Sequence, residues 1–229
     1  MADQLTSLIT VQRSFAGDAS HQLRTPLTAL QLRLERASEL IGTDPAAATA
    51  RLDAALVETQ RLQNIVEGLL VLSRAENQAT IAPTPIEISQ LVQERLTHWE
   101  ALAAESNVTL QSTSASAGQI LAIPAVIEQV IDNYIDNALH ASPPGSTITV
   151  SMTNDGGHTT VHVVDEGPGM PDEDLARAFN RFWRAQSDEY GSGLGLAIVE
   201  RLVQACAGSV QLINVQPHGI DAQATFKDA

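Results

Sequence analysis

A histidine with polar neighbours stands near the N-terminal end of the chain. His21 and Thr25 are four residues apart, so they share one face of the helix that this region predicts. Asp18 and Arg24 flank His21 at three residues on either side. A neutral imidazole is a nucleophile because histidine titrates at about pH 6.5, and it can attack phosphorus once a neighbour orients it. From these residues alone, a phosphoryl acceptor and a solvated helix histidine both stay open.

Two asparagines in the second half of the chain have the spacing of a phosphate or magnesium site. Asn133 and Asn137 lie on one face of a predicted helix, and His140 lies close by. Carboxamides offer oxygens to Mg²⁺ and donors to phosphates, whereas carboxylates there would repel a triphosphate. The alternative is an ordinary polar helix surface.

Two glycine-containing segments follow these asparagines. Asp165-Glu-Gly167-Pro-Gly169-Met170 comes after an alternating strand; an acid there can accept the exocyclic amine of adenine, and glycines let the backbone approach a ring. A plain turn is the alternative. Gly191-Ser-Gly193-Leu194-Gly195 opens a helix, whose amides and dipole favour phosphate. It is neither a P-loop, since Gly-Lys-Ser/Thr is missing, nor a convincing Rossmann fingerprint.

Aromatic and basic residues precede the second glycine segment. Phe182, Trp183 and Arg184 combine the side chains that a lid over a triphosphate would need. Local core packing is the alternative for the two aromatic residues, and it is compatible with a phosphate contact from Arg184.

The histidine belongs to a predicted helical hairpin. Apolar residues recur at threes and fours over 2–41 and over 45–76, and Gly42-Thr-Asp-Pro45 ends one helix and starts the next. Pro26 removes the helical partner of the Gln22 carbonyl, so we expect a bend that gives a second molecule access to His21. One hairpin cannot cover both apolar stripes, which favours a second copy and a four-helix bundle, with packing on the rest of the chain as the alternative.

The remainder predicts an α+β domain with helices on one face of a mixed sheet. Two prolines, Pro83 and Pro85, mark a linker. We therefore divide the chain into a helical domain over 1–80, a linker over 81–85 and a mixed domain over 86–229. In the mixed domain we predict helices over 90–106, 124–141 and 194–207. We predict strands over 86–89, 108–111, 119–122, 147–152, 160–164, 209–214 and 222–226.

Composition excludes several classes of function. Thirteen basic against 27 acidic residues give a net charge of −14, which argues against nucleic acid or an anionic membrane surface as the main partner. The single cysteine, Cys206, cannot form an intrachain disulfide and is expected to be a core residue. The sequence has no apolar run of about 20 residues, so we expect no membrane span.

The order of these motifs resembles that of the sensor histidine kinases of two-component systems. The run from Asp18 to Leu27 resembles their histidine box, and the four later motifs resemble their catalytic ATP-binding domain, of the GHKL type. The resemblance implies an antiparallel helical hairpin that forms a dimeric four-helix bundle, followed by an α/β sandwich that binds ATP and Mg²⁺. A GHKL chaperone or topoisomerase ATPase is disfavoured, because no histidine box belongs there.

The resemblance also implies roles for individual residues. His21 is the phosphoacceptor, Thr25 helps to position water for dephosphorylation of the response regulator, and Arg24 and Gln22 belong to the same catalytic box. Asn137 holds magnesium with support from Asn133, and His140 stands where the family often has lysine. The implied nucleotide-binding residues are Asn133, Asn137, His140, Asp165, Gly167, Gly169, Phe182, Arg184, Gly191, Gly193, Leu194 and Gly195.

Gln22 departs from the family, which usually has an acidic residue directly after the histidine. Its amide oxygen can accept the ring N–H and fix the tautomer, but it cannot take a proton at neutral pH, and general-base help contributes about 10²–10⁴-fold. The main expectation is an autokinase that passes the phosphoryl group from His21 to a response-regulator aspartate, with phosphatase activity toward that regulator. The alternatives are a phosphatase-dominant or kinase-impaired form and a non-enzymatic, nucleotide-bound dimer scaffold.

The resemblance finally implies partners and a location. We expect a homodimer that binds the receiver domain of a response regulator and no nucleic acid. We also expect the cytoplasmic portion of a membrane-anchored sensor kinase, with contact to the membrane only through an upstream segment absent here.

Overall fold

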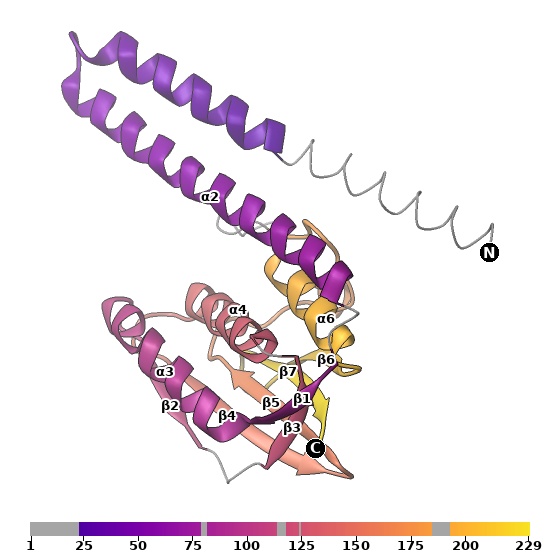
Figure 1. Cartoon of the computed structure of the whole chain (residues 1–229). Helices are drawn as coiled ribbons and strands as arrows, with labels where there is room; N and C mark the ends of the chain where they lie inside the picture. The colour runs from indigo at the N-terminus through magenta and orange to yellow at the C-terminus, as the bar shows by residue number, and fades with distance from the viewer. Residues whose placement is uncertain (1–22, 79–81, 114–117, 124, 185–192) are drawn as a thin grey trace, which may run out of the picture. The chain divides into compact units, whose positions relative to one another are not determined.

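The computed structural model describes residues 23–78, 82–113, 118–123, 125–184 and 193–229. The chain forms two compact units, which divide between Leu70 and Val71 (Figure 1). In the described residues, no helix is both long enough and apolar enough to cross a membrane.

The first unit contains a helical hairpin. Residues 23–40 are helical, and α2 spans Pro45–Gln78, so that its residues from Val71 on belong to the second unit. Helix α2 begins as the sequence predicts. The Asp44 carboxylate accepts a hydrogen bond from the Ala47 amide at 3.0 Å, and Pro45 takes the first helical position. The helix continues through Pro26, but the Gln22 carbonyl, on which the predicted bend depends, lies outside the described residues.

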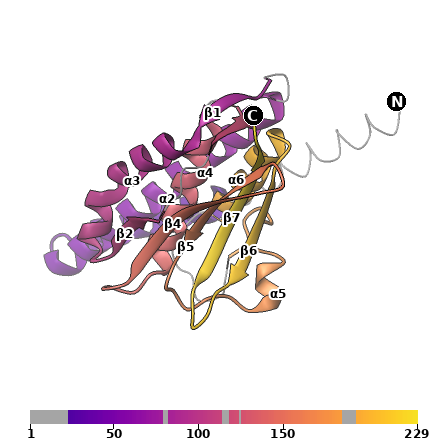
Figure 2. The same cartoon turned by 90° about the horizontal axis from the view of Figure 1, so that it is seen from below.

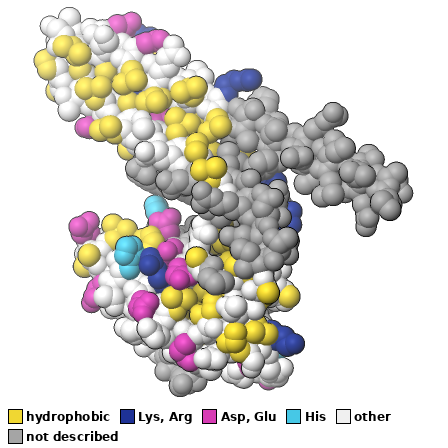
Figure 3. All heavy atoms as spheres, in the orientation of Figure 1, with side chains coloured by type: hydrophobic (Ala, Val, Ile, Leu, Met, Phe, Trp, Pro, Cys, Tyr) yellow, Lys and Arg dark blue, Asp and Glu magenta, His cyan; other side chains and the backbone are white. Residues whose placement is uncertain are grey.

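Each helix of the hairpin buries small or apolar residues and exposes larger ones. The buried residues include Ala37, Ala48, Ala55 and Ile65. Yellow side chains cover much of the visible hairpin in Figure 3. The exposed large apolar residues of this unit are Leu27, Leu32, Leu34, Ile41, Leu52, Leu56, Val57, Val66 and Leu70. Soluble monomers rarely expose contiguous apolar surface of this kind, so the hairpin presents a surface suited to association.

The second unit is built on a five-stranded mixed sheet in the order β2-β4-β5-β7-β6, with β2 parallel to β4 and the other pairs antiparallel. A separate antiparallel pair joins β1 and β3. The strands are β1 (Thr84–Glu87), β2 (Thr109–Ser112), β3 (Gln119–Ala122), β4 (Thr147–Asp155), β5 (His158–Val164), β6 (Ser209–Asn214) and β7 (Ile220–Lys227). The helices are α3 (Ile88–Glu105), α4 (Val126–Ala141), α5 (Asp172–Leu175) and α6 (Gly195–Ala205).

The core lies between one face of this sheet and helices α3, α4 and α6 (Figure 2). Alternation along β5 decides which side chains enter it: Val161 and Val163 are buried, whereas Thr160 and His162 are half-buried on the opposite face. Helix α4 is anchored by Tyr134, whose hydroxyl donates to the Gln223 carbonyl oxygen on β7 at 2.9 Å. This bond fixes the rotation of α4 relative to the sheet.

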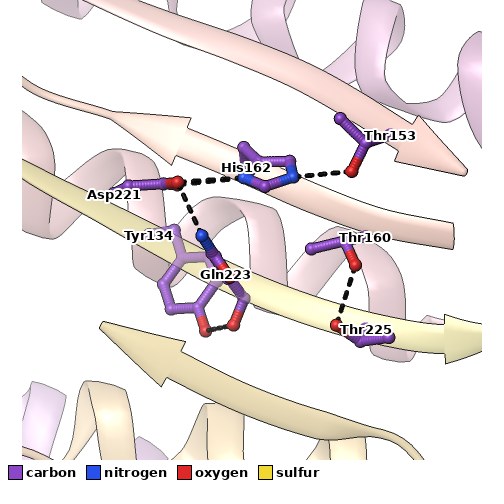
Figure 4. A network of polar contacts seen from close by, with 7 residues as sticks. All are labelled: Tyr134, Thr153, Thr160, His162, Asp221, Gln223 and Thr225. Carbon is purple, nitrogen blue, oxygen red and sulfur yellow. Dashed lines mark hydrogen bonds and ion pairs between the residues drawn. The ribbon is translucent and has the colours of Figure 1, made fainter. Parts of the chain in front are cut away.

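Polar side chains join three strands on the opposite face of the sheet (Figure 4). His162 Nδ1 lies 3.0 Å from the nearer oxygen of Asp221, and Nε2 lies 2.9 Å from the Thr153 hydroxyl. Gln223 donates to the same Asp221 carboxylate at 2.7 Å. Because a carboxylate only accepts, Nδ1 of His162 carries the hydrogen. The contacts hold β4, β5 and β7 in register.

Three details differ from the sequence-based expectations or refine them. Strand β1 begins at Thr84, inside the segment predicted as a linker, and its Pro85 is tolerated because β1 pairs with β3 alone and is an edge strand. The short helix α5 was not expected. Cys206 is buried, as expected, and its sulfur accepts a hydrogen bond from the Ile123 amide at 3.3 Å.

Candidate functional site

The two asparagines of α4 face the first residue of α6. A Cβ atom placed on Gly195 would lie 2.9 Å from Asn133 Oδ1 and within 3.7 and 3.8 Å of the Asn137 amide nitrogen and oxygen. The Asn133 amide group also donates to the Gln129 carbonyl at 2.7 Å, which restrains this side chain. The absence of a side chain at position 195 therefore lets the carboxamides approach the start of α6.

Among the described residues, the N-cap position of α6 supplies no side-chain hydrogen bond to the first amides of the helix. The residue before it, Leu194, is fully buried and anchors this end, and its carbonyl accepts the first helical bond, from Ile198, at 2.8 Å. The first amides of a helix have no partner within the helix and carry part of the positive end of its dipole. An anionic group is therefore favoured at this end, beside Asn137.

Phe182 and Gly193 are joined directly. The Phe182 amide donates to the Gly193 carbonyl at 2.7 Å. Gly193 has φ +67°, and a Cβ there would lie 2.8 Å from the Phe182 carbonyl carbon. Glycine is required at 193 for both its backbone angle and the close approach. Arg184, two residues after Phe182, is half-buried.

Asp165 begins a tightly held loop after β5. Its side chain is buried, and Oδ1 accepts hydrogen bonds from the amides of Gly167 at 2.8 Å and Ile220 at 3.3 Å. Burial raises the pKa of Asp165, while these two bonds and the nearby His218 oppose the rise. A Cβ on Gly167 would lie 2.9 Å from the Ala141 carbonyl oxygen at the end of α4. The loop therefore packs against the helix that carries the asparagines.

His140 is exposed near the end of α4. Its Nδ1 lies 2.7 Å from the Asp136 carbonyl oxygen and 3.5 Å from the Asp136 carboxylate. The pKa of Asp136 is raised by burial and by the neighbouring Asp132, and His140 opposes the rise. The backbone contact fixes one edge of the imidazole on the helix surface.

The structure thus brings two groups of predicted site residues together at α4, each combining residues from different elements or packing against this helix. One contains Asn133, Asn137 and Gly195, and the other contains Asp165 and Gly167. In the hairpin, Thr25 and Arg24 are exposed, and the Arg24 carbonyl accepts a hydrogen bond from Thr28. The predicted residues His21, Gln22 and Gly191 lie outside the described residues.

Sequence reasoning missed two contacts of the Asp165 loop. Asn214 on β6 bonds Met170 at the end of the loop, and Gly219 lies against the Asp165 carbonyl. An asparagine after an alternating strand and a glycine in a following turn have ordinary local explanations. Their role depends on strand pairing, which no local pattern shows.

The residues around α4 fit a magnesium–nucleotide complex. Mg²⁺ prefers oxygen ligands and usually takes few of them from the protein, with phosphates and waters completing its shell. The side-chain oxygens of Asn133 and Asn137 are of this type. Within the described parts of the chain, no three His, Cys, Asp or Glu side chains lie close enough to hold a metal together.

Two family models match the chain. Residues 11–78 match the His Kinase A (phospho-acceptor) domain, and residues 122–229 match the histidine kinase-, DNA gyrase B- and HSP90-like ATPase domain. The Escherichia coli (strain K12) sensor protein CreC is 34% identical over 204 residues, which are 88% of this chain and 42% of CreC. The chain spans about half the length of the curated relatives it matches.

Solved structures of histidine kinases are also similar to this chain. The Acinetobacter baumannii histidine kinase AdeS has a TM-score of 0.68 and 28% identity, covering 91% of this chain and 97% of AdeS. Full-length ShkA in complex with AMPPNP has a TM-score of 0.66 and 25% identity, covering 95% of this chain and 46% of ShkA.

Proposed function

Since the chain belongs to the sensor histidine kinases of two-component systems, we propose that it transfers the γ-phosphoryl group of ATP to His21 and then to a response-regulator aspartate. The observation that carries this proposal is the approach of Asn133 and Asn137 to Gly195 at the start of α6. Two carboxamides beside the first amides of α6 supply both oxygens and donors where a polyphosphate would lie. ShkA, a related kinase, was solved with an ATP analogue.

In this proposal the second unit positions the donor. Phosphoryl transfer depends mainly on positioning and on stabilisation of charge. The amides of α6 and Arg184 balance phosphate charge, Asn137 and Asn133 hold Mg²⁺, and the Asp165 carboxylate accepts the amine of adenine. Bound magnesium would supply further charge neutralisation.

The first unit supplies the acceptor. His21 attacks the γ-phosphorus and forms an N–P bond as the bond to the ADP oxygen breaks, and the remaining ring N–H proton is lost to water. Gln22 orients the imidazole without accepting its proton, so this step lacks general-base help. Thr25 is exposed on the described helix, where it supports a role in orienting water for dephosphorylation of the regulator. A phosphatase-dominant enzyme is the second candidate, because Gln22 weakens only the kinase step.

The hairpin dimerises in this proposal. Nine large apolar residues are exposed on the described hairpin, and a second copy would bury them in a four-helix bundle. We assign 1–80 to dimerisation and phosphoacceptance, 81–85 to a linker and 86–229 to catalysis. The receiver domain of a response regulator is the protein substrate, and anchoring to a membrane would come through an upstream segment.

The experiment is incubation with γ-labelled ATP and Mg²⁺. Labelled protein is expected from the chain and none from His21→Ala, while His98→Ala, which changes an exposed histidine on α3, keeps the label. Label that survives His21→Ala would contradict the assignment. A non-enzymatic scaffold would bind ATP without acquiring label. Chemically phosphorylated regulator tests the phosphatase, which Thr25→Ala is expected to slow.

A further inference from the structure

The hairpin formed by β6 and β7 contacts the start of the Asp165–Met170 loop. The Asp165 amide donates to the Ile220 carbonyl at 3.0 Å, and the Ile220 amide donates to Asp165 Oδ1 at 3.3 Å. Gly219 has φ +117°, and a Cβ there would collide with the Asp165 carbonyl oxygen. The start of the loop is therefore bonded to the first residue of β7.

The same hairpin contacts the end of the loop through one side chain. Asn214 Oδ1 accepts a hydrogen bond from the Met170 amide at 2.9 Å, and Asn214 Nδ2 donates to the Met170 carbonyl at 2.7 Å. The carboxamide thus pairs with Met170 as a neighbouring strand would, through one donor and one acceptor. Gly169 makes room for this contact, since a Cβ there would lie 2.9 Å from Asn214 Oδ1.

Asn214 and Ile220 are themselves cross-strand partners, at the turn end of the β6–β7 hairpin. One pair of residues therefore holds both ends of the loop, Ile220 through its backbone and Asn214 through its side chain. With both ends fixed, the conformation of the segment between them is restricted, including the Asp165 carboxylate that Gly167 and Ile220 orient.

We propose that Asn214 is a positioning residue for recognition of the nucleotide base. It acts through Met170, by keeping the loop in the conformation that directs Asp165 toward an exocyclic amine. The inference rests on the proposed function, in which Asp165 reads adenine. A capping role for Asn214 in stability alone would predict no effect on the choice of base.

The test measures binding of Mg·ATP and Mg·GTP by calorimetry to the chain and to Asn214→Leu, which removes both bonds at similar size. Both bonds are solvent-exposed, and water can partly replace them. We therefore expect a three- to tenfold rise in the Kd for ATP, which is about the effect of losing one or two exposed hydrogen bonds. The ratio of the GTP to the ATP Kd is expected to fall. Simple destabilisation would lower the melting temperature and leave this ratio unchanged.

Further variants keep the inference testable. Asn214→Ser also loses both contacts and retains a polar surface, so it is expected to repeat the result if Asn214→Leu folds poorly. Gln211→Leu changes an exposed residue on the same strand and is expected to leave both Kd values unchanged. Asp165→Asn is expected to lose base discrimination altogether.

The outcomes separate the two proposals. If the chain does not bind ATP, or if Asp165→Asn binds ATP and GTP as the wild type does, the assignment of the base site is wrong. If Asp165→Asn loses discrimination while both Asn214 variants retain the wild-type Kd and ratio, the role given to Asn214 is overturned. A fall in the ratio for both Asn214 variants supports it.

Discussion

Replacement of Gly195 by alanine separates nucleotide binding from stability. The new Cβ would lie 2.9 Å from Asn133 Oδ1, closer than van der Waals contact allows, so this carboxamide must turn away. Turning breaks its 2.7 Å bond to the Gln129 carbonyl. Asn137 is less affected, because its nearest atoms would lie 3.7 and 3.8 Å from the Cβ.

The expected change in stability is small because two effects oppose each other. Loss of the Asn133–Gln129 bond costs about 0.5–1.5 kcal/mol. Alanine in place of glycine in a helix gains up to about 1 kcal/mol, and less at the first position. The free energy of unfolding of Gly195→Ala should therefore stay within about 1 kcal/mol of the wild type.

The effect on nucleotide binding should be larger. Displacement of Asn133 and a methyl group at the start of α6 both obstruct the polyphosphate, and a tenfold loss corresponds to about 1.4 kcal/mol. We expect at least a tenfold rise in the Kd for Mg·ATP, measured by calorimetry, with denaturant unfolding measured in parallel. Gly118→Ala is the control, because a Cβ at Gly118 meets no atom within 4 Å. Unchanged ATP affinity in Gly195→Ala would refute the placement of the phosphates beside α6.

Three further variants test other parts of the structure. Tyr134→Phe loses the bond to the Gln223 carbonyl and should lower the free energy of unfolding by about 1 kcal/mol in urea titrations, with little change in ATP affinity of the folded protein. Burial raises the pKa of Asp165, so the folded state binds its proton more tightly than the unfolded state, and stability falls as pH rises from the unfolded pKa to the folded one. Asp165→Asn should therefore stabilise the protein at pH 7 in thermal unfolding, lose that gain in acid, and bind ATP more weakly. Gln22→Glu should increase the rate of His21 labelling by about 10²-fold or more in single-turnover assays, and an unchanged rate would show that position 22 does not supply a base.

The sequence predicts those parts of the site that depend on local spacing. Asn133 and Asn137 share a helical face by their separation alone, and Gly195 follows from the glycine-rich start of a helix. The alternation of β5 likewise places Val161 and Val163 in the core. In each case a pattern of fewer than ten residues determines the outcome.

Contacts that depend on strand order could not be predicted. Asn214 meets Met170 because β6 lies at the edge of the sheet beside β7, and this order comes from the whole domain. Ile220 is apolar, so nothing in its side chain marks the backbone bonds that it makes with Asp165. The pairing of β1 with β3 could not be predicted either. Pro85 indicates a linker, and this segment is a strand only because it pairs with β3.

Helix α4 sets the distance between the two regions that would contact the proposed ligand. Its middle faces Gly195 and its last residue, Ala141, meets Gly167, while Tyr134 and a buried apolar face hold it rigidly on the sheet. A helix rises about 1.5 Å per residue, so along its axis Ala141 lies about 6 Å from Asn137 and about 12 Å from Asn133. Mono-, di- and triphosphates of one nucleoside would share a base position and differ only in their reach toward α6. Length discrimination would then depend on the spacing that the backbone of α4 sets between its two contact regions.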